Sequence, residues 1–156
     1  MENLIRKIRL VRQQHSSGCG VACLAAVQNK SYTEAMSQVM GVLRWSGKRE
    51  NFFLRVGEIR ALLEDAKLAF AEEKFSQWSD LPGLSIVGVK IHQSDSGYHH
   101  WVVVMRGKDK EFVMDPRYGE IYDRATKKHK KHLVERPHSI AFHLAKRFEG
   151  IVDIEI

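Results

Sequence analysis

Residues 18–28 read GCGVACLAAVQ, and they give the first strong helix signal along the chain. Val21, Leu24 and Ala25 recur at the spacing of one helix face, so the stretch predicts a helix over residues 21–28. The polar run at residues 29–31 ends this helix. Because the helix comes ahead of a β-rich second half, it decides the class of fold.

Cys19 lies between Gly18 and Gly20, just before this helix. Unpaired backbone N–H groups and the macrodipole favour negative charge at a helix N-terminus, and the thiolate is the reactive form of cysteine. The two glycines carry no side chain that would block a substrate's approach to the sulfur. Cys19 is therefore the candidate nucleophile, whereas Cys23, one turn deeper, is expected to be a small core residue.

The rest of the chain indicates an α+β fold. Two more helices are predicted near residues 34–42, with Ser31 or Thr33 as the cap, and near residues 55–66. Strands are predicted at residues 84–91, 99–105, 111–114, 121–122, 139–145 and 151–156. Helices followed by an antiparallel meander predict N-terminal helices packed on an antiparallel β-sheet.

The composition fits a single domain over residues 1–156. The chain is 44% hydrophobic and 28% charged, close to the globular average, so a real core is expected. Two cysteines are too few for a small secreted disulfide scaffold and suit a reducing compartment. Without a secretory core or a long apolar run, we expect no membrane span and a cytoplasmic location, with non-classical export left open.

The net charge of +6 favours acidic partners. Part of the excess lies in residues 127–132, which read KKHKKH. No aromatic residue is interleaved in that run, so we expect a solvated face or a site for an acidic partner rather than a specific nucleic-acid site.

Two segments in the second half carry polar residues at the ends of predicted strands. Residues 97–104 read GYHHWVVV and residues 112–116 read FVMDP. A hairpin through Gly107 would join two antiparallel strands and bring His100 beside Asp115. A histidine can take the thiol proton and later protonate a leaving amine, and a carboxylate holds the imidazole in the useful tautomer.

His99 is the alternative base, and the two histidines alternate faces on a strand. His100 shares a face with Val102 and Val104, and His99 shares one with Trp101 and Val103. We favour His100 because it lies directly before Trp101, the order that the resemblance given below also implies. The same alternation argues against a zinc site built from this pair and the cysteines. No metal and no organic cofactor are expected.

Gln13 precedes Cys19 by six positions. We predict that its side-chain amide, together with the Cys19 backbone N–H, donates to the oxyanion of a tetrahedral intermediate. One well-placed donor of this kind contributes about 3 kcal/mol to lowering the barrier. Gln14 is the alternative, because the choice rests on spacing alone.

The order Gln-x5-Cys-Gly, then His-aromatic-Val-Val, then Asp-Pro resembles the papain-like cysteine proteases. Residues 19–26, CGVACLAA, resemble the nucleophile helix of the bacteriocin-processing peptidases, which remove double-glycine leader peptides. Residues 81–83, LPG, resemble the segment that leads into the sheet of those peptidases. Such domains are usually about this size and lie at the N-terminus of an ATP-driven exporter. The resemblance covers most of residues 11–122.

The resemblance implies a papain-like fold with Cys19 as nucleophile, His100 as base, Asp115 as the orienting group and Gln13 as oxyanion donor. The implied activity is that of a cysteine peptidase that processes a leader or precursor peptide through a thioester.

Three alternatives stay open. A free-standing effector or toxin that cuts one target protein, with an immunity or inhibitor protein as partner, would use the same triad. A transglutaminase or deamidase would also use it. A non-catalytic module that binds peptides is the alternative outside the enzymes, although clamping a peptide does not require the three residues together.

Overall fold

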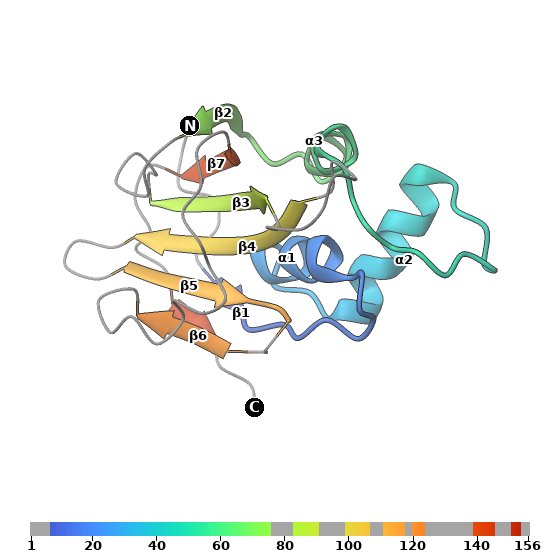
Figure 1. The fold of residues 1–156 in the computed structure, drawn as a ribbon, viewed down its shortest axis with the longest axis horizontal. Helices are drawn as coiled ribbons and strands as arrows, with labels where there is room; N and C mark the ends of the chain where they lie inside the picture. The colour runs from blue at the N-terminus through green and yellow to red at the C-terminus, as the bar shows by residue number, and fades with distance from the viewer. Residues whose placement is uncertain are drawn as a thin grey trace.

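The computed structural model describes residues 7–75, 83–90, 99–106, 111–117, 120–123, 139–145 and 151–153. These residues form an α+β fold in which helices pack against an antiparallel sheet (Figure 1). The predictions for residues 81–82, 107 and 127–132, and for the side chain of His99, lie outside the described residues. No helix in the described ranges is long and apolar enough to cross a membrane.

The helices are α1 (Cys19–Val27), α2 (Tyr32–Leu43) and α3 (Val56–Asp65), which confirms the three predicted ones. Ser31 caps α2, because its Oγ accepts a hydrogen bond from the Glu34 backbone N–H at 3.1 Å. The Glu34 carboxylate accepts one from the Ser31 N–H, also at 3.1 Å. This capping box starts α2 two residues before the predicted start.

Helix α1 is buried on every side, whereas the sequence pattern predicted one apolar stripe. It contacts α2, the short strand β1 (Lys7–Arg9) and strand β4 (His99–Arg106). The residues outside the predicted stripe are small ones such as Gly20, Ala22 and Cys23, so neighbouring elements can approach closely from all directions. The N-terminal end of α1 is therefore fixed from several sides.

The described strands form a sheet in the order β2–β7–β3–β4–β5–β6, with every neighbouring pair antiparallel, and a parallel pair β1–β8. Their bounds are β2 (Ala71–Phe75), β3 (Leu84–Lys90), β5 (Glu111–Asp115), β6 (Glu120–Asp123), β7 (Ser139–Ala145) and β8 (Ile151–Asp153). Six of the strands were predicted. Strands β1 and β2 were not, because β1 is only three residues long and β2 is a polar edge strand.

Trp101 joins the sheet to the helices. It is fully buried, and its indole Nε1 donates a hydrogen bond to the Leu54 carbonyl at 2.8 Å. A Cβ built at Gly20 would lie 3.2 Å from Trp101 Cδ1 and 3.0 Å from Leu54 Cδ1. Gly20 therefore allows α1 to approach β4 at the point where the site is built.

We expect Trp101→Phe to lower the free energy of unfolding by about 2–4 kcal/mol, because it opens a cavity and leaves the buried Leu54 carbonyl unpaired. Urea denaturation measures the change. The matched control is Trp45→Phe, since Trp45 is only partly buried and packs at 6.1 Å from the Phe52 ring. An equal loss in both variants would contradict the role given to Trp101.

Candidate active site

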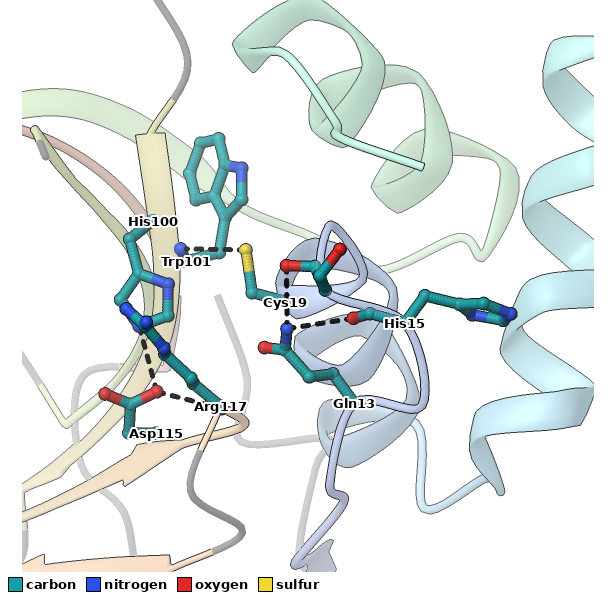
Figure 2. Close-up of polar contacts among 8 residues, drawn as sticks. Gln13, His15, Cys19, His100, Trp101, Asp115 and Arg117 are labelled. Carbon is teal, nitrogen blue, oxygen red and sulfur yellow. Dashed lines mark hydrogen bonds and ion pairs between the residues drawn. The ribbon is translucent and has the colours of Figure 1, made fainter. Parts of the chain in front are cut away.

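Cys19 is the first residue of α1 and is only 3% exposed. The backbone N–H of Trp101 donates to its Sγ at 3.5 Å, so β4 lies directly against the sulfur (Figure 2). Gly18 provides no side-chain cap, and the first turn of α1 contains no acidic residue. The first N–H groups of a helix lack partners within the helix. The N-terminal end of α1, where Cys19 lies, therefore favours a negatively charged group.

The glycines around Cys19 serve packing, which corrects the reason we gave for them from the sequence. A Cβ at Gly18 would overlap the Tyr32 hydroxyl and lie 3.0 Å from Tyr32 Cζ. The space beside Gly20 is filled by Leu54 and Trp101. Both glycines therefore let other elements close around the start of α1.

His100 and Asp115 are brought together by strands β4 and β5. Val103 pairs with Met114 in the antiparallel register of these strands. Continued by one residue, the same register sets Asp115 opposite Val102. His100 lies two residues further along on the same face. Its Nε2 is 2.9 Å from Asp115 Oδ1, and Figure 2 shows its ring beside both Asp115 and Cys19. Because Nε2 is engaged, Nδ1 is the nitrogen left for the cysteine proton.

The groups around His100 favour the protonated form of its imidazole ring. Burial disfavours the charged ring, but the hydrogen bond to Asp115 and the interaction with the Cys19 side chain outweigh it and raise the pKa of His100 to about 9. Asp115 is fully buried, and its Oδ1 also accepts from the Arg117 backbone N–H at 3.0 Å. The other oxygen, Oδ2, is buried without a hydrogen-bond partner among the described residues. The imidazolium is thus the neighbour that balances this carboxylate.

Gln13 lies beside Cys19, but its amide hydrogens are engaged elsewhere. Nε2 donates to the carbonyl of His15 at 2.9 Å and to that of Ser16 at 3.0 Å (Figure 2). Both acceptors are carbonyls, so the hydrogen bonds fix which end of the amide carries nitrogen. Donation to an oxyanion requires that Gln13 exchange one of these bonds. In the arrangement described, Gln13 holds the loop before Cys19 in place.

No pattern in the sequence indicated that Tyr32 belongs to the site. Its hydroxyl is 2.8 Å from His15 Nδ1, and the His15 ring packs against Phe52 at 4.5 Å. Burial raises the pKa of Tyr32 to about 12, so the hydroxyl stays protonated. The Phe52 backbone N–H in turn donates to Ser17 Oγ at 2.9 Å. These contacts clamp the loop at residues 13–18, and they join segments that no local pattern connects.

A cleft of about 450 Å³ opens over Cys19 and His100. Residues 12–16 form one wall, and Phe53 and Arg117 contribute to the lining. Gln14, the alternative to Gln13, is exposed and lines this same cleft. The sulfur and the imidazole therefore share a cavity of the size that holds a small ligand or a few peptide residues.

Cys23 behaves as predicted. It is fully buried and unpaired, and burial, followed by the nearby Cys19 and Asp115, raises the pKa of its thiol. In the described part of the chain, no group of three or more His, Cys, Asp or Glu residues is placed to hold a metal ion.

We expect Gly18→Ala to destabilise the protein by about 1–3 kcal/mol, because the new methyl group would overlap the Tyr32 hydroxyl. Tyr32→Phe removes that hydroxyl, so Gly18→Ala should cost clearly less in the Tyr32→Phe background. Urea unfolding of the four proteins gives the coupling energy. Additive costs, within about 0.5 kcal/mol, would contradict the clamp.

We expect an NMR titration to place the midpoint of His100 near pH 9 and Asp115→Asn to lower it, because the lost carboxylate favours the protonated ring. His100→Gln assigns the signal. The folded-state pKa lies above 6.5, so the stability that this proton provides is complete below pH 6.5 and is lost as the pH rises towards 9. A midpoint near 6.5 in both proteins would contradict the pairing.

No protein-family description matches the chain, and no curated protein sequence matches it either. The chemistry is therefore inferred from the arrangement of the residues. A cysteine at a helix start and an imidazole line one cleft, and a buried carboxylate lies behind the imidazole.

Proposed function

We propose that this chain is a papain-like cysteine peptidase. The observation that carries the proposal is the 2.9 Å contact between His100 Nε2 and Asp115 Oδ1, with the ring interacting with Cys19 on its other side. Covalent catalysis needs this order of nucleophile, base and orienting group. The cysteine-bearing helix that packs on an antiparallel sheet, and the order of the motifs along the chain, agree with a papain-like fold.

The first half of the reaction forms a thioester. Cys19 Sγ, as the thiolate, attacks the carbonyl carbon of the peptide bond and gives a tetrahedral intermediate. His100, protonated at Nδ1, donates that proton to the leaving amine as the C–N bond breaks. Asp115 keeps Nε2 engaged throughout, so the ring stays oriented and the imidazolium is stabilised.

The oxyanion of the intermediate has two candidate donors. The Cys19 backbone N–H belongs to the first turn of α1, where N–H groups lack partners within the helix. Gln13 is the second, and it donates once the oxyanion replaces the Ser16 or His15 carbonyl on its Nε2. Each well-placed donor lowers the activation barrier by about 3 kcal/mol.

The second half of the reaction releases the acyl group. Neutral His100 takes a proton from water, the resulting hydroxide attacks the thioester carbon, and the C–S bond breaks to free the acid and Cys19. The same intermediate would pass its acyl group to an amine in a transglutaminase. The resemblance to leader peptidases favours water, and it makes a leader or precursor peptide ending in Gly-Gly the first substrate to test.

We expect the purified protein to cleave a peptide that carries a Gly-Gly leader end, with Cys19→Ala inactive. His100→Ala and Asp115→Asn should lower kcat/KM by on the order of 10³–10⁴, because the base or its orientation is lost. Mass spectrometry of the products measures cleavage. Adding a primary amine separates hydrolysis from acyl transfer by the mass of the product.

Labelling with iodoacetamide followed by peptide mapping tests the site without a known substrate. We expect label on Cys19, slowed by His100→Ala, and none on the fully buried Cys23. A rate of Cys19 labelling that is the same with and without His100 would count against the thiolate–imidazolium pair.

A further inference from the structure

The Gln13 amide is held in a resting position that does not serve the proposed reaction. Both of its hydrogens are engaged, because Nε2 donates to the His15 carbonyl at 2.9 Å and to the Ser16 carbonyl at 3.0 Å (Figure 2). Its oxygen, Oε1, is buried without a hydrogen-bond partner among the described residues. A buried acceptor without a donor is costly. The resting position therefore carries a cost that a turn of the amide relieves.

The Gln13 side chain can leave this position without dismantling the loop. The Gln13 backbone N–H donates to the Pro116 carbonyl at 3.0 Å, so the backbone stays anchored while the side chain turns. The His15 carbonyl also accepts from the Gly18 N–H at 3.0 Å and keeps that partner. Ser16 is exposed, so water can replace Gln13 at its carbonyl. The exchange therefore moves one side chain.

Open space borders Gln13 on two sides. It lines the cleft over Cys19, and it also lines a second cleft, of about 370 Å³, together with Gln14 and Tyr32. A side chain between two cavities is less confined than one in the close-packed core. Gln13 therefore has room for a second orientation.

Tyr32 fixes the carbonyl that holds Gln13. Its hydroxyl is 2.8 Å from His15 Nδ1, and Tyr32 itself is the first residue of α2 and only 4% exposed. Figure 2 shows the His15 ring turned away from Cys19, so His15 reaches the site through its carbonyl and not through its imidazole. A hydrogen bond between α2 and the loop thus sets the position of an acceptor for Gln13 Nε2.

We propose that the protein rests in a latent state, with Gln13 locked on the loop, and that Tyr32, acting through His15, is the positioning residue that sets the locked fraction. The inference rests on the proposed function, because it concerns the oxyanion donor of that reaction. In the released state Gln13 Nε2 turns to the oxyanion. A protein of which only a fraction is competent binds its ligand more weakly by that same fraction. One neutral hydrogen bond changes such an equilibrium by about two- to tenfold.

A peptide aldehyde that ends in Gly-Gly tests this balance. The Cys19 thiol adds across its C=O bond, so a C–S bond forms, the carbonyl π bond breaks and the thiol proton passes to the oxygen, which takes the place of the oxyanion. Iodoacetamide also forms a C–S bond at Cys19, with iodide leaving, but it creates no such oxygen. The affinity of the aldehyde divided by the rate of alkylation therefore reports the donors. Protection of Cys19 from iodoacetamide, followed by mass spectrometry, gives both values.

We expect Tyr32→Phe to raise this ratio by about two- to tenfold, because the protein loses the bond that favours the locked state. His15→Phe keeps a ring to pack on Phe52 and removes Nδ1, so it should raise the ratio by a similar factor. The two changes together should give no more than either alone, because both remove the same hydrogen bond. A ratio that stays at the wild-type value, or falls, in either variant would overturn the proposal.

Two further variants show whether the effect passes through Gln13. Gln13→Ala should lower the ratio about tenfold or more, and adding Tyr32→Phe to it should bring no rise. A rise of the same size without the Gln13 amide would overturn the proposal, since Tyr32 would then act by another route. The matched control is Tyr122→Phe, which removes a hydroxyl from β6, two strands from β4, and should leave the ratio unchanged.

The latent state and the peptidase activity fail in different ways. An aldehyde adduct on Cys19 with a ratio that is insensitive to Tyr32 would remove the latent state and leave the proposed reaction. No adduct on Cys19, although iodoacetamide labels it, would remove the proposed reaction and the latent state with it.

Discussion

Helix α1 packs against strand β4, and this contact brings Cys19 and His100 together. The helix is buried on all sides, its first residue carries the sulfur, and the neighbouring Gly20 lets Leu54 and Trp101 close in. The Trp101 backbone N–H then meets the sulfur from the strand side. A distance between two side chains that is set by buried packing is rigid, because a close-packed core resists small displacements. The geometry of the site is thus set by the core itself.

Asp115, His100 and Cys19 form a row that runs from the buried carboxylate to the cleft. Asp115 is fully buried with one oxygen unpaired among the described residues, a costly state unless a positive neighbour balances it. His100 is that neighbour, and its raised pKa is the other side of the same interaction. The carboxylate therefore gains a counter-ion, and the sulfur gains an imidazolium beside it. Stability and proposed catalysis depend on one proton, which links both to pH in the range from 6.5 to 9.

The loop before Cys19 contains Gly18 and Gln13, which the sequence singled out for substrate access and oxyanion donation. In the structure both residues also hold the loop in place. Gly18 is required because Tyr32 occupies the space that a side chain would take, and Gln13 uses its amide to hold the carbonyls of His15 and Ser16. A fixed loop holds the N-terminal end of α1 in place, where the first N–H groups lack partners within the helix, and this agrees with the proposed oxyanion site. Arg12 and Arg117 line the same cleft.

The sequence by itself determined the α+β class, the three helices, six of the strands and the core position of Cys23, because these follow from local periodicity, helix caps and apolar runs. It also indicated that His100 and Asp115 would meet, since neighbouring antiparallel strands bring those ends together. Only the tertiary structure decided that β7 lies between β2 and β3, that Tyr32 holds the loop at residues 13–18, and that arginines line the cleft. These features join residues far apart in the chain, and such contacts depend on how whole elements pack, which short-range patterns do not encode.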